Sequence, residues 1–116
     1  VGNVRYEYKI DIYNKIMLKS EKSRGSYGPG IDKLIRKVIE TGSLNKATKE
    51  MNMSYSKAWK LLNRTEEMLG FELIERHAGA KGSDITEEGK RLIEYYDLLT
   101  KATKEAIDKV NENFEW

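Results

Sequence analysis

The sequence predicts an α+β fold in a single domain that covers residues 1–116. Three observations predict this class. Apolar and polar residues alternate strictly between residues 4 and 12, which is the period of a half-buried β-strand. Three stretches within residues 31–69 repeat apolar residues every three or four positions, as amphipathic helices do. A glycine-bearing segment at 71–86 then separates these helices from a long apolar stripe at 87–114.

The N-terminal segment, residues 1–24, is expected to form a β-hairpin. One face of its first strand would carry Val4, Tyr6, Tyr8, Ile10 and Ile12. Asn14 suits a tight turn because asparagine tolerates positive φ, and residues 16–18 are expected to return as the second strand. The following stretch, "KSEKSRGSYGPG", reads as a polar, glycine-rich loop whose Pro29 helps to start a helix.

The three-helix unit is expected within residues 31–69. The first helix has one apolar stripe, made of Ile31, Leu34, Ile35, Val38 and Ile39. Gly42 suits its C-terminal cap. Ser43 and Ser54 suit the N-caps of the second and third helices. Asn52 lies where the chain must turn sharply between them, and Gly70 ends the third helix.

Two helices joined by so tight a turn predict a helix-turn-helix, which in its DNA-binding version places the later helix in the major groove. Residues 43–64 hold five basic residues and one acidic residue, a net charge of +4. Residues 84–116 hold five basic and nine acidic residues, a net charge of −4. This separation favours an anionic partner for the middle of the chain. The residues predicted to contact DNA here are Ser43, Ser54, Tyr55, Ser56, Lys57, Lys60, Asn63 and Arg64.

A wing is expected at residues 71–86, because "FELIERHAGAKGSDIT" reads as a strand, a glycine-bearing loop and a short strand. Its tip carries Arg76, His77 and Lys81, which we expect to contact the DNA backbone or the minor groove. His77 is the one histidine and the chain has no cysteine. A metal site with the usual nitrogen and sulfur ligands is therefore not expected, and neither is a cofactor.

The last helix, predicted at 87–114 after a cap at Thr86, is longer than a small domain needs. Beyond Leu99 its apolar stripe has little of the domain left to cover; this part holds Ala102, Thr103, Ala106, Ile107 and Val110. Two readings stay open for it. An antiparallel helix from a second subunit would bury the stripe, or the helix is a linker that leads to a sensor domain.

Four stretches carry a resemblance to a known family: "GPG", "TGSLNKATKEMNMSYSKAWKLL", "LIERHAGAKG" and "ITEEGKRLIEYY". In this order they resemble the DNA-binding domain of the ModE family, molybdate-responsive transcriptional regulators with a winged helix-turn-helix. The resemblance covers about residues 27–97. Its most specific part is "SYSKAW", whereas "ITEEGKRL" alone also fits LysR-type regulators. It implies a bacterial or archaeal regulator that binds double-stranded DNA as a homodimer.

The sequence departs from that family in three ways. Asn52 stands where the family usually has glycine, and the wing has fewer glycines than is usual. The oxyanion-binding portion follows this domain in full-length members, whereas this sequence ends soon after the long helix. The resemblance therefore does not transfer molybdate binding, and molybdate is not expected to bind this chain alone.

The predicted function is sequence-specific DNA binding in transcription regulation. No enzyme is predicted, because the sequence offers no paired acid and base with a nucleophile and no P-loop. Two alternatives stay open: a winged helix that binds proteins but not DNA, and a small oxyanion-binding protein. No apolar run approaches the roughly 18 residues of a membrane helix, and no signal segment opens the sequence, so a cytoplasmic location is predicted.

Overall fold

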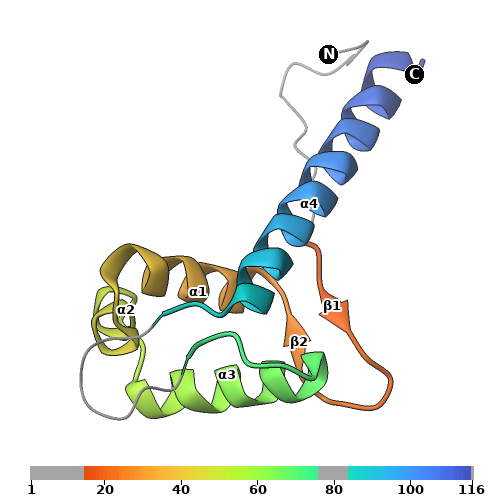
Figure 1. Cartoon of the computed structure of the whole chain (residues 1–116). Coiled ribbons are helices and arrows are strands. Elements are labelled where there is room, and N and C mark those ends of the chain that lie inside the picture. The colour runs from red at the N-terminus through yellow and green to blue at the C-terminus, as the bar shows by residue number, and fades with distance from the viewer. Residues whose placement is uncertain (1–14, 76–83, 116) are drawn as a thin grey trace.

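The computed structural model describes residues 15–75 and 84–115. The fold is α+β, a winged helix-turn-helix with a long C-terminal helix (Figure 1). In chain order the elements are β1 (Leu18–Lys19), β2 (Ser26–Tyr27), α1 (Pro29–Thr41), α2 (Leu44–Glu50), α3 (Tyr55–Leu69) and α4 (Glu87–Asn113).

Helix α1 begins at Pro29, two residues before the predicted start, because proline's fixed φ suits the first turn and its missing N–H costs nothing there. The predicted stripe is buried at Ile31, Leu34, Ile35 and Val38. Ile39 was expected on the same stripe, but 53% of it is exposed. The helix ends as predicted at Gly42, whose φ of 75° is in the left-handed region.

The turn between α2 and α3 has the predicted geometry. Asn52 has a φ of 52°, the one positive φ of a non-glycine residue within the described chain. This reversal lets the Met53 N–H donate to the Thr48 carbonyl at 2.9 Å. Because asparagine adopts the left-handed region more readily than most residues, Asn52 makes this turn without a glycine.

The hairpin that the structure describes begins in the predicted second strand and continues past it. β1 pairs with β2 in antiparallel register, with Leu18 opposite Tyr27. β2 therefore falls in the stretch that reads as a polar loop, and its Tyr27 is fully buried. The predicted first strand, residues 4–12, lies outside the described residues.

The base of the wing is a single antiparallel bridge between Ile74 and Ile85. The Glu75 N–H donates to the Asp84 carbonyl at 2.7 Å, directly next to that bridge. Residues 76–83, which include the predicted tip residues Arg76, His77 and Lys81, lie outside the described part of the chain.

Helix α4 is capped by Thr86, whose hydroxyl accepts from the Gly89 N–H at 3.0 Å. Its first turns pack on the core through Gly89, Leu92 and Tyr96, and the rest projects away from the three shorter helices (Figure 1). The helix ends at Asn113, one residue before the predicted end.

Candidate nucleic-acid interface

The N-terminal two thirds of α3 presents a polar, basic surface to solvent. The exposed residues of this surface are Ser54, Tyr55, Ser56, Lys57, Lys60, Asn63 and Arg64. The opposite side of α3 is buried through Ala58, Leu62, Thr65 and Glu66. All seven were predicted to contact DNA; the structure leaves all seven exposed, and their contact with DNA stays a prediction.

Three cations form one stripe on this surface. Lys57, Lys60 and Arg64 lie three and four positions apart, which places them close together on a helix. Within residues 15–75 and 84–115, none of the three forms an ion pair. Glu67 is the next charged residue on this side, so the positive stripe is confined to the first two and a half turns. Side chains near the start of a recognition helix are the ones that reach base edges.

The two predicted cap serines do cap their helices. Ser54 Oγ accepts from the Lys57 N–H at 3.1 Å, and Ser43 Oγ accepts from the Lys46 N–H at 3.2 Å. Ser43 is half-buried at the start of α2, whereas Ser54 is exposed at the start of α3. Each hydroxyl satisfies one N–H of its helix start and leaves the N–H groups before it for another acceptor.

Tyr55 and Trp59 contact each other at the edge of this surface. Their ring centroids are 6.1 Å apart in an edge-to-face arrangement. Trp59 is half-buried against the core, and Tyr55 is 45% exposed. The pair therefore acts as packing at the margin of α3, which leaves the polar stripe as the surface that faces outward.

The buried side of α3 is fixed by two polar contacts. Thr65 Oγ1 donates to the Ser26 carbonyl of β2 at 2.8 Å. Glu66 is 9% exposed and accepts from the Leu73 N–H at 2.6 Å and from the Ile74 N–H at 3.3 Å. Glu66 was not predicted from the sequence, although its position four residues after Leu62 places its carboxylate on the core-facing side of α3.

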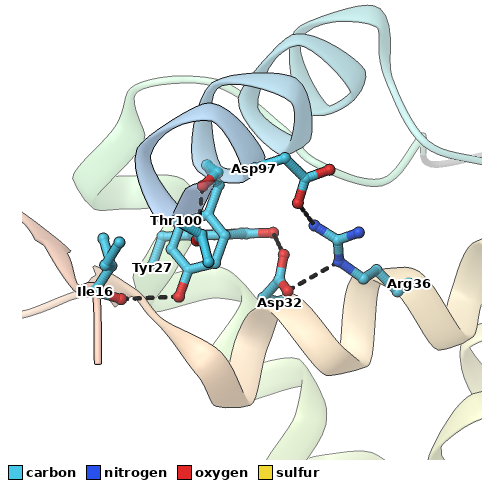
Figure 2. A network of polar contacts seen from close by, with 7 residues as sticks. Ile16, Tyr27, Asp32, Arg36, Asp97 and Thr100 are labelled. Carbon is cyan, nitrogen blue, oxygen red and sulfur yellow. Dashed lines mark hydrogen bonds and ion pairs between the residues drawn. The ribbon is translucent and has the colours of Figure 1, made fainter. Parts of the chain in front are cut away.

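A second polar network joins the hairpin, α1 and α4 (Figure 2). Tyr27 donates to Asp32 Oδ1 at 2.7 Å, and Arg36 Nε donates to Asp32 Oδ2 at 2.9 Å. Arg36 also reaches Asp97 Oδ1 on α4 at 2.6 Å. Burial raises the pKa of Tyr27 well above that of a free tyrosine, and the hydrogen bond to Asp32 raises it further. The hydrogen bond to Asp32 is also the main cause of a raised Arg36 pKa.

A groove of about 410 Å³ lies where α1 ends, beside the base of the wing and the start of α4. Its apolar floor includes Val38 and Ile85, and its carboxylates are Glu75, Asp84 and Glu87. Among the described residues that line it, Lys90 is the one basic residue, and it is paired with Glu87 at 3.1 Å. Three carboxylates make this groove unsuited to an oxyanion, so it does not extend the basic surface of α3.

Within residues 15–75 and 84–115, no three His, Cys, Asp or Glu side chains lie close enough to hold a metal ion. In the same residues no helix is both long and apolar enough to cross a membrane.

Comparison with known proteins places this helix-turn-helix in a family. Residues 33–90, half of the chain, match the bacterial regulatory helix-turn-helix proteins of the lysR family. The chain belongs to this family. The matched residues run from α1 through α2, α3 and the wing to the first turn of α4, which is the part that carries the basic stripe.

Curated relatives of this lysR-type domain include transcriptional regulators. The DNA-binding transcriptional dual regulator ModE of Escherichia coli K12 is 31% identical over 83 residues, which are 69% of this chain and 32% of the relative. The transcriptional regulator ModE of Haemophilus influenzae is 32% identical over 78 residues, 65% of this chain and 31% of the relative. The HTH-type regulator SoxR of an Arthrobacter strain is 32% identical over 79 residues, 68% of this chain and 27% of the relative. The chain thus carries a ModE-like helix-turn-helix and spans 27–32% of these relatives' length.

Proposed function

We propose that this chain is a sequence-specific DNA-binding module of a transcriptional regulator, with α3 as its recognition helix. The observation that carries the proposal is the stripe of Lys57, Lys60 and Arg64 on the outward side of α3. Lysine and arginine bind phosphate oxygens and guanine acceptors, and the turn before α3 leaves its first residues uncovered. Membership of the lysR family and the DNA-binding function of the related regulator ModE support the same proposal. A chromosomal DNA partner would place the chain in the cytoplasm.

The N-cap residues add a second group of DNA contacts to the proposal. Ser54 and Ser43 hold the starts of α3 and α2, where free N–H groups and the helix dipole favour a phosphate. Ser56 and Asn63 flank the cationic stripe and offer hydroxyl and amide groups to bases or phosphates. The wing tip residues Arg76, His77 and Lys81 are proposed as backbone or minor-groove contacts on the sequence evidence alone.

The proposed module works as a homodimer through α4. Tyr95, Leu98 and Val110 are 53%, 61% and 62% exposed, and they lie on one side of α4. Ala102 and Ala106 lie between them and are exposed, so two antiparallel helices could approach closely at the centre of the stripe. Ile107, which the sequence places in this stripe, is half-buried and lies to one side. The competing function for the same stripe is a linker to a further domain.

We propose that molybdate does not regulate this chain by itself. An oxyanion of that size needs several donors that converge in one pocket. The candidate donors Ser43, Ser54 and Thr86 each accept a backbone N–H at the start of a different helix. Isothermal titration with molybdate, followed by DNA binding at constant ionic strength, tests this. A saturable site that changes DNA affinity would restore the sensor role to these residues.

The experiment that tests DNA binding is a titration of labelled duplex DNA at several salt concentrations. A DNA-binding module loses affinity steeply with salt, because each neutralised phosphate releases counterions. Removing two cations with Lys57→Ala/Lys60→Ala should lower the salt slope by about two, one for each lost phosphate contact. The matched control, Lys101→Ala/Lys104→Ala, removes the same charge from α4. If the chain is instead a protein-interaction module, the parent should bind the duplex only weakly. Both double variants should then bind the duplex as the parent does.

A further inference from the structure

β2 lies between the recognition helix and α4 and contacts both (Figure 1). Towards α3, the Ser26 carbonyl accepts from Thr65 at 2.8 Å. A Cβ on Gly25 would lie only 2.0 Å from the Arg64 carbonyl oxygen, so the backbone of Gly25 packs directly on α3. Towards α4, the next residue, Tyr27, packs edge-to-face on Tyr96 with ring centroids 5.1 Å apart. Three consecutive residues of the hairpin therefore bridge the two helices.

Helix α4 is supported at two places along its length. The first support is its start, where Thr86 donates to the Glu72 carbonyl at 2.6 Å and Gly89 packs against the Leu73 carbonyl. The second support is Tyr96 and Asp97. Tyr96 donates to the Ile16 carbonyl at 2.8 Å, and Asp97 pairs with Arg36 at 2.6 Å (Figure 2). Contacts at two separated places fix the direction of the α4 axis, whereas contacts at its start alone would leave the helix free to rotate about that point.

Between residues 98 and 113, α4 forms no hydrogen bond or ion pair with another element of the described chain. The supports at Gly89 and Tyr96 are about 10 Å apart, and Asn113 lies about 36 Å from Gly89, at 1.5 Å per residue. A displacement of 1 Å at Tyr96 would therefore become a displacement of more than about 3 Å at Asn113. Small changes at the second support are amplified along the helix.

We propose that Tyr96 and Asp97 are positioning residues that set the direction of α4 relative to α3 through β2 and the Asp32–Arg36 pair. The consequence for DNA rests on the proposed function. If two copies pair through α4, this direction sets the separation and rotation of their recognition helices. The pair of residues then determines which half-site spacing the dimer accepts.

The alignment is tested by distance measurements between spin labels, which the absence of cysteine makes straightforward. Labels are attached at Glu67→Cys on α3 and Glu112→Cys on α4, both exposed positions, and the labelled chain is diluted with unlabelled chain. The variant Tyr96→Phe/Asp97→Asn preserves volume but removes the Ile16 hydrogen bond and the Arg36 pair. It should broaden the distance distribution or shift it by about 3 Å or more, given the ratio of lengths along α4.

Asp108→Asn is the matched control, because among the described residues Asp108 pairs only within α4, with Lys104 at 3.1 Å. It should leave the distribution unchanged. Thermal unfolding of all variants shows which of them fold. If the double variant does not fold, the distance distribution is measured with Asp97→Asn alone, which changes an exposed position. A parent-like mean and width in the folded variants would overturn the proposal.

The consequence for DNA is tested with duplexes whose half-sites are one base pair closer or further apart. One base pair rotates a half-site by about 35° and moves it by about 3.4 Å. On a duplex whose spacing is changed by one base pair, the parent should lose about tenfold in affinity, comparable to the effect of one wrong base pair. The Tyr96→Phe/Asp97→Asn variant should lose less than about threefold on the same duplex. A merely structural role would weaken all spacings equally and would overturn the proposal. Absence of DNA binding by the parent would refute the proposed function instead, while the spin labels still decide the alignment.

Discussion

At the scale of single residues, Lys57 and Lys60 carry the proposed contact with DNA. Both are exposed on the first turns of α3, and neither is paired within the described chain. We expect Lys57→Ala and Lys60→Ala each to weaken binding to the preferred duplex by about 1–3 kcal/mol if the lysine holds a base edge. A lysine that holds only a phosphate would weaken all sequences alike and lower the salt slope by about one.

Binding of both variants is measured on the preferred duplex and on a scrambled duplex at several salt concentrations. Lys101→Ala is the single-residue control, because it removes the same charge from the exposed side of α4. If both α3 variants bind as tightly as this control, the outward surface of α3 is not the DNA contact.

Glu66 is expected to stabilise the fold and not to contact DNA. Its carboxylate accepts two backbone N–H groups at the start of the wing while being 9% exposed. Glu66→Gln replaces a charged acceptor with a neutral amide and should lower the free energy of unfolding by about 1–3 kcal/mol. Glu67→Gln, the exposed neighbour, should change it by less than about 0.5 kcal/mol. Chemical denaturation of the two variants compares them, and equal stabilities would mean that Glu66 does not anchor the wing.

At the scale of elements, the hairpin packs on α3 with no room for a side chain at Gly25. A Cβ at Gly25 would lie 2.0 Å from the Arg64 carbonyl oxygen, and backbone cannot rotate away as a side chain can. Gly25→Ala should therefore cost about 1–3 kcal/mol of stability. A Cβ at Gly30, in the first turn of α1, would have no described atom within 4 Å. Gly30→Ala should therefore raise the free energy of unfolding by up to about 1 kcal/mol.

Thermal unfolding of the two alanine variants gives the comparison. The two changes in stability should have opposite signs. Gly25 lets the hairpin backbone approach α3 closely, whereas Gly30 only weakens the start of α1. A Gly25→Ala protein as stable as the parent would show that the hairpin does not pack on α3 as described.

The helices could be predicted from the sequence because each carries its own signals. Periodicity identified the buried side of α1, and Gly42, Ser54 and Gly70 marked helix ends that need no distant partner. Asn52 marked the turn for the same local reason, its tolerance of positive φ. The outward surface of α3 followed from its buried side, so most of the candidate site was predictable.

The hairpin could not be predicted, because its strands have two residues each and carry too little alternation to be read as strands. Their pairing depends on contacts distant in sequence, above all Thr65 with the Ser26 carbonyl. The same limitation applies to Tyr27, buried beneath Tyr96 of a helix 69 residues later. Ile39 was placed on the core stripe by periodicity alone, whereas the structure leaves it in the groove beside the wing.

At the scale of the whole molecule, the exposed stripe of α4 is proposed to hold two copies together. Leu98→Glu would place a charge in the apolar contact between the two helices and should produce monomers that lose most affinity for a two-half-site duplex. Light scattering measures the mass, and Lys101→Glu on the charged side of the same helix is the control. An unchanged mass in Leu98→Glu would assign the dimer contact to another surface and favour the linker function for α4.

The central claim is that α3 reads DNA sequence, and selection of bound duplexes from a random pool tests it most directly. The enriched duplexes should contain an inverted repeat whose half-sites lie about 34 Å apart, one helical turn, or a multiple of it. Repeating the selection with Lys60→Ala should relax the preference at one position in each half-site. A pool that remains random after repeated rounds with the parent chain would contradict sequence-specific binding.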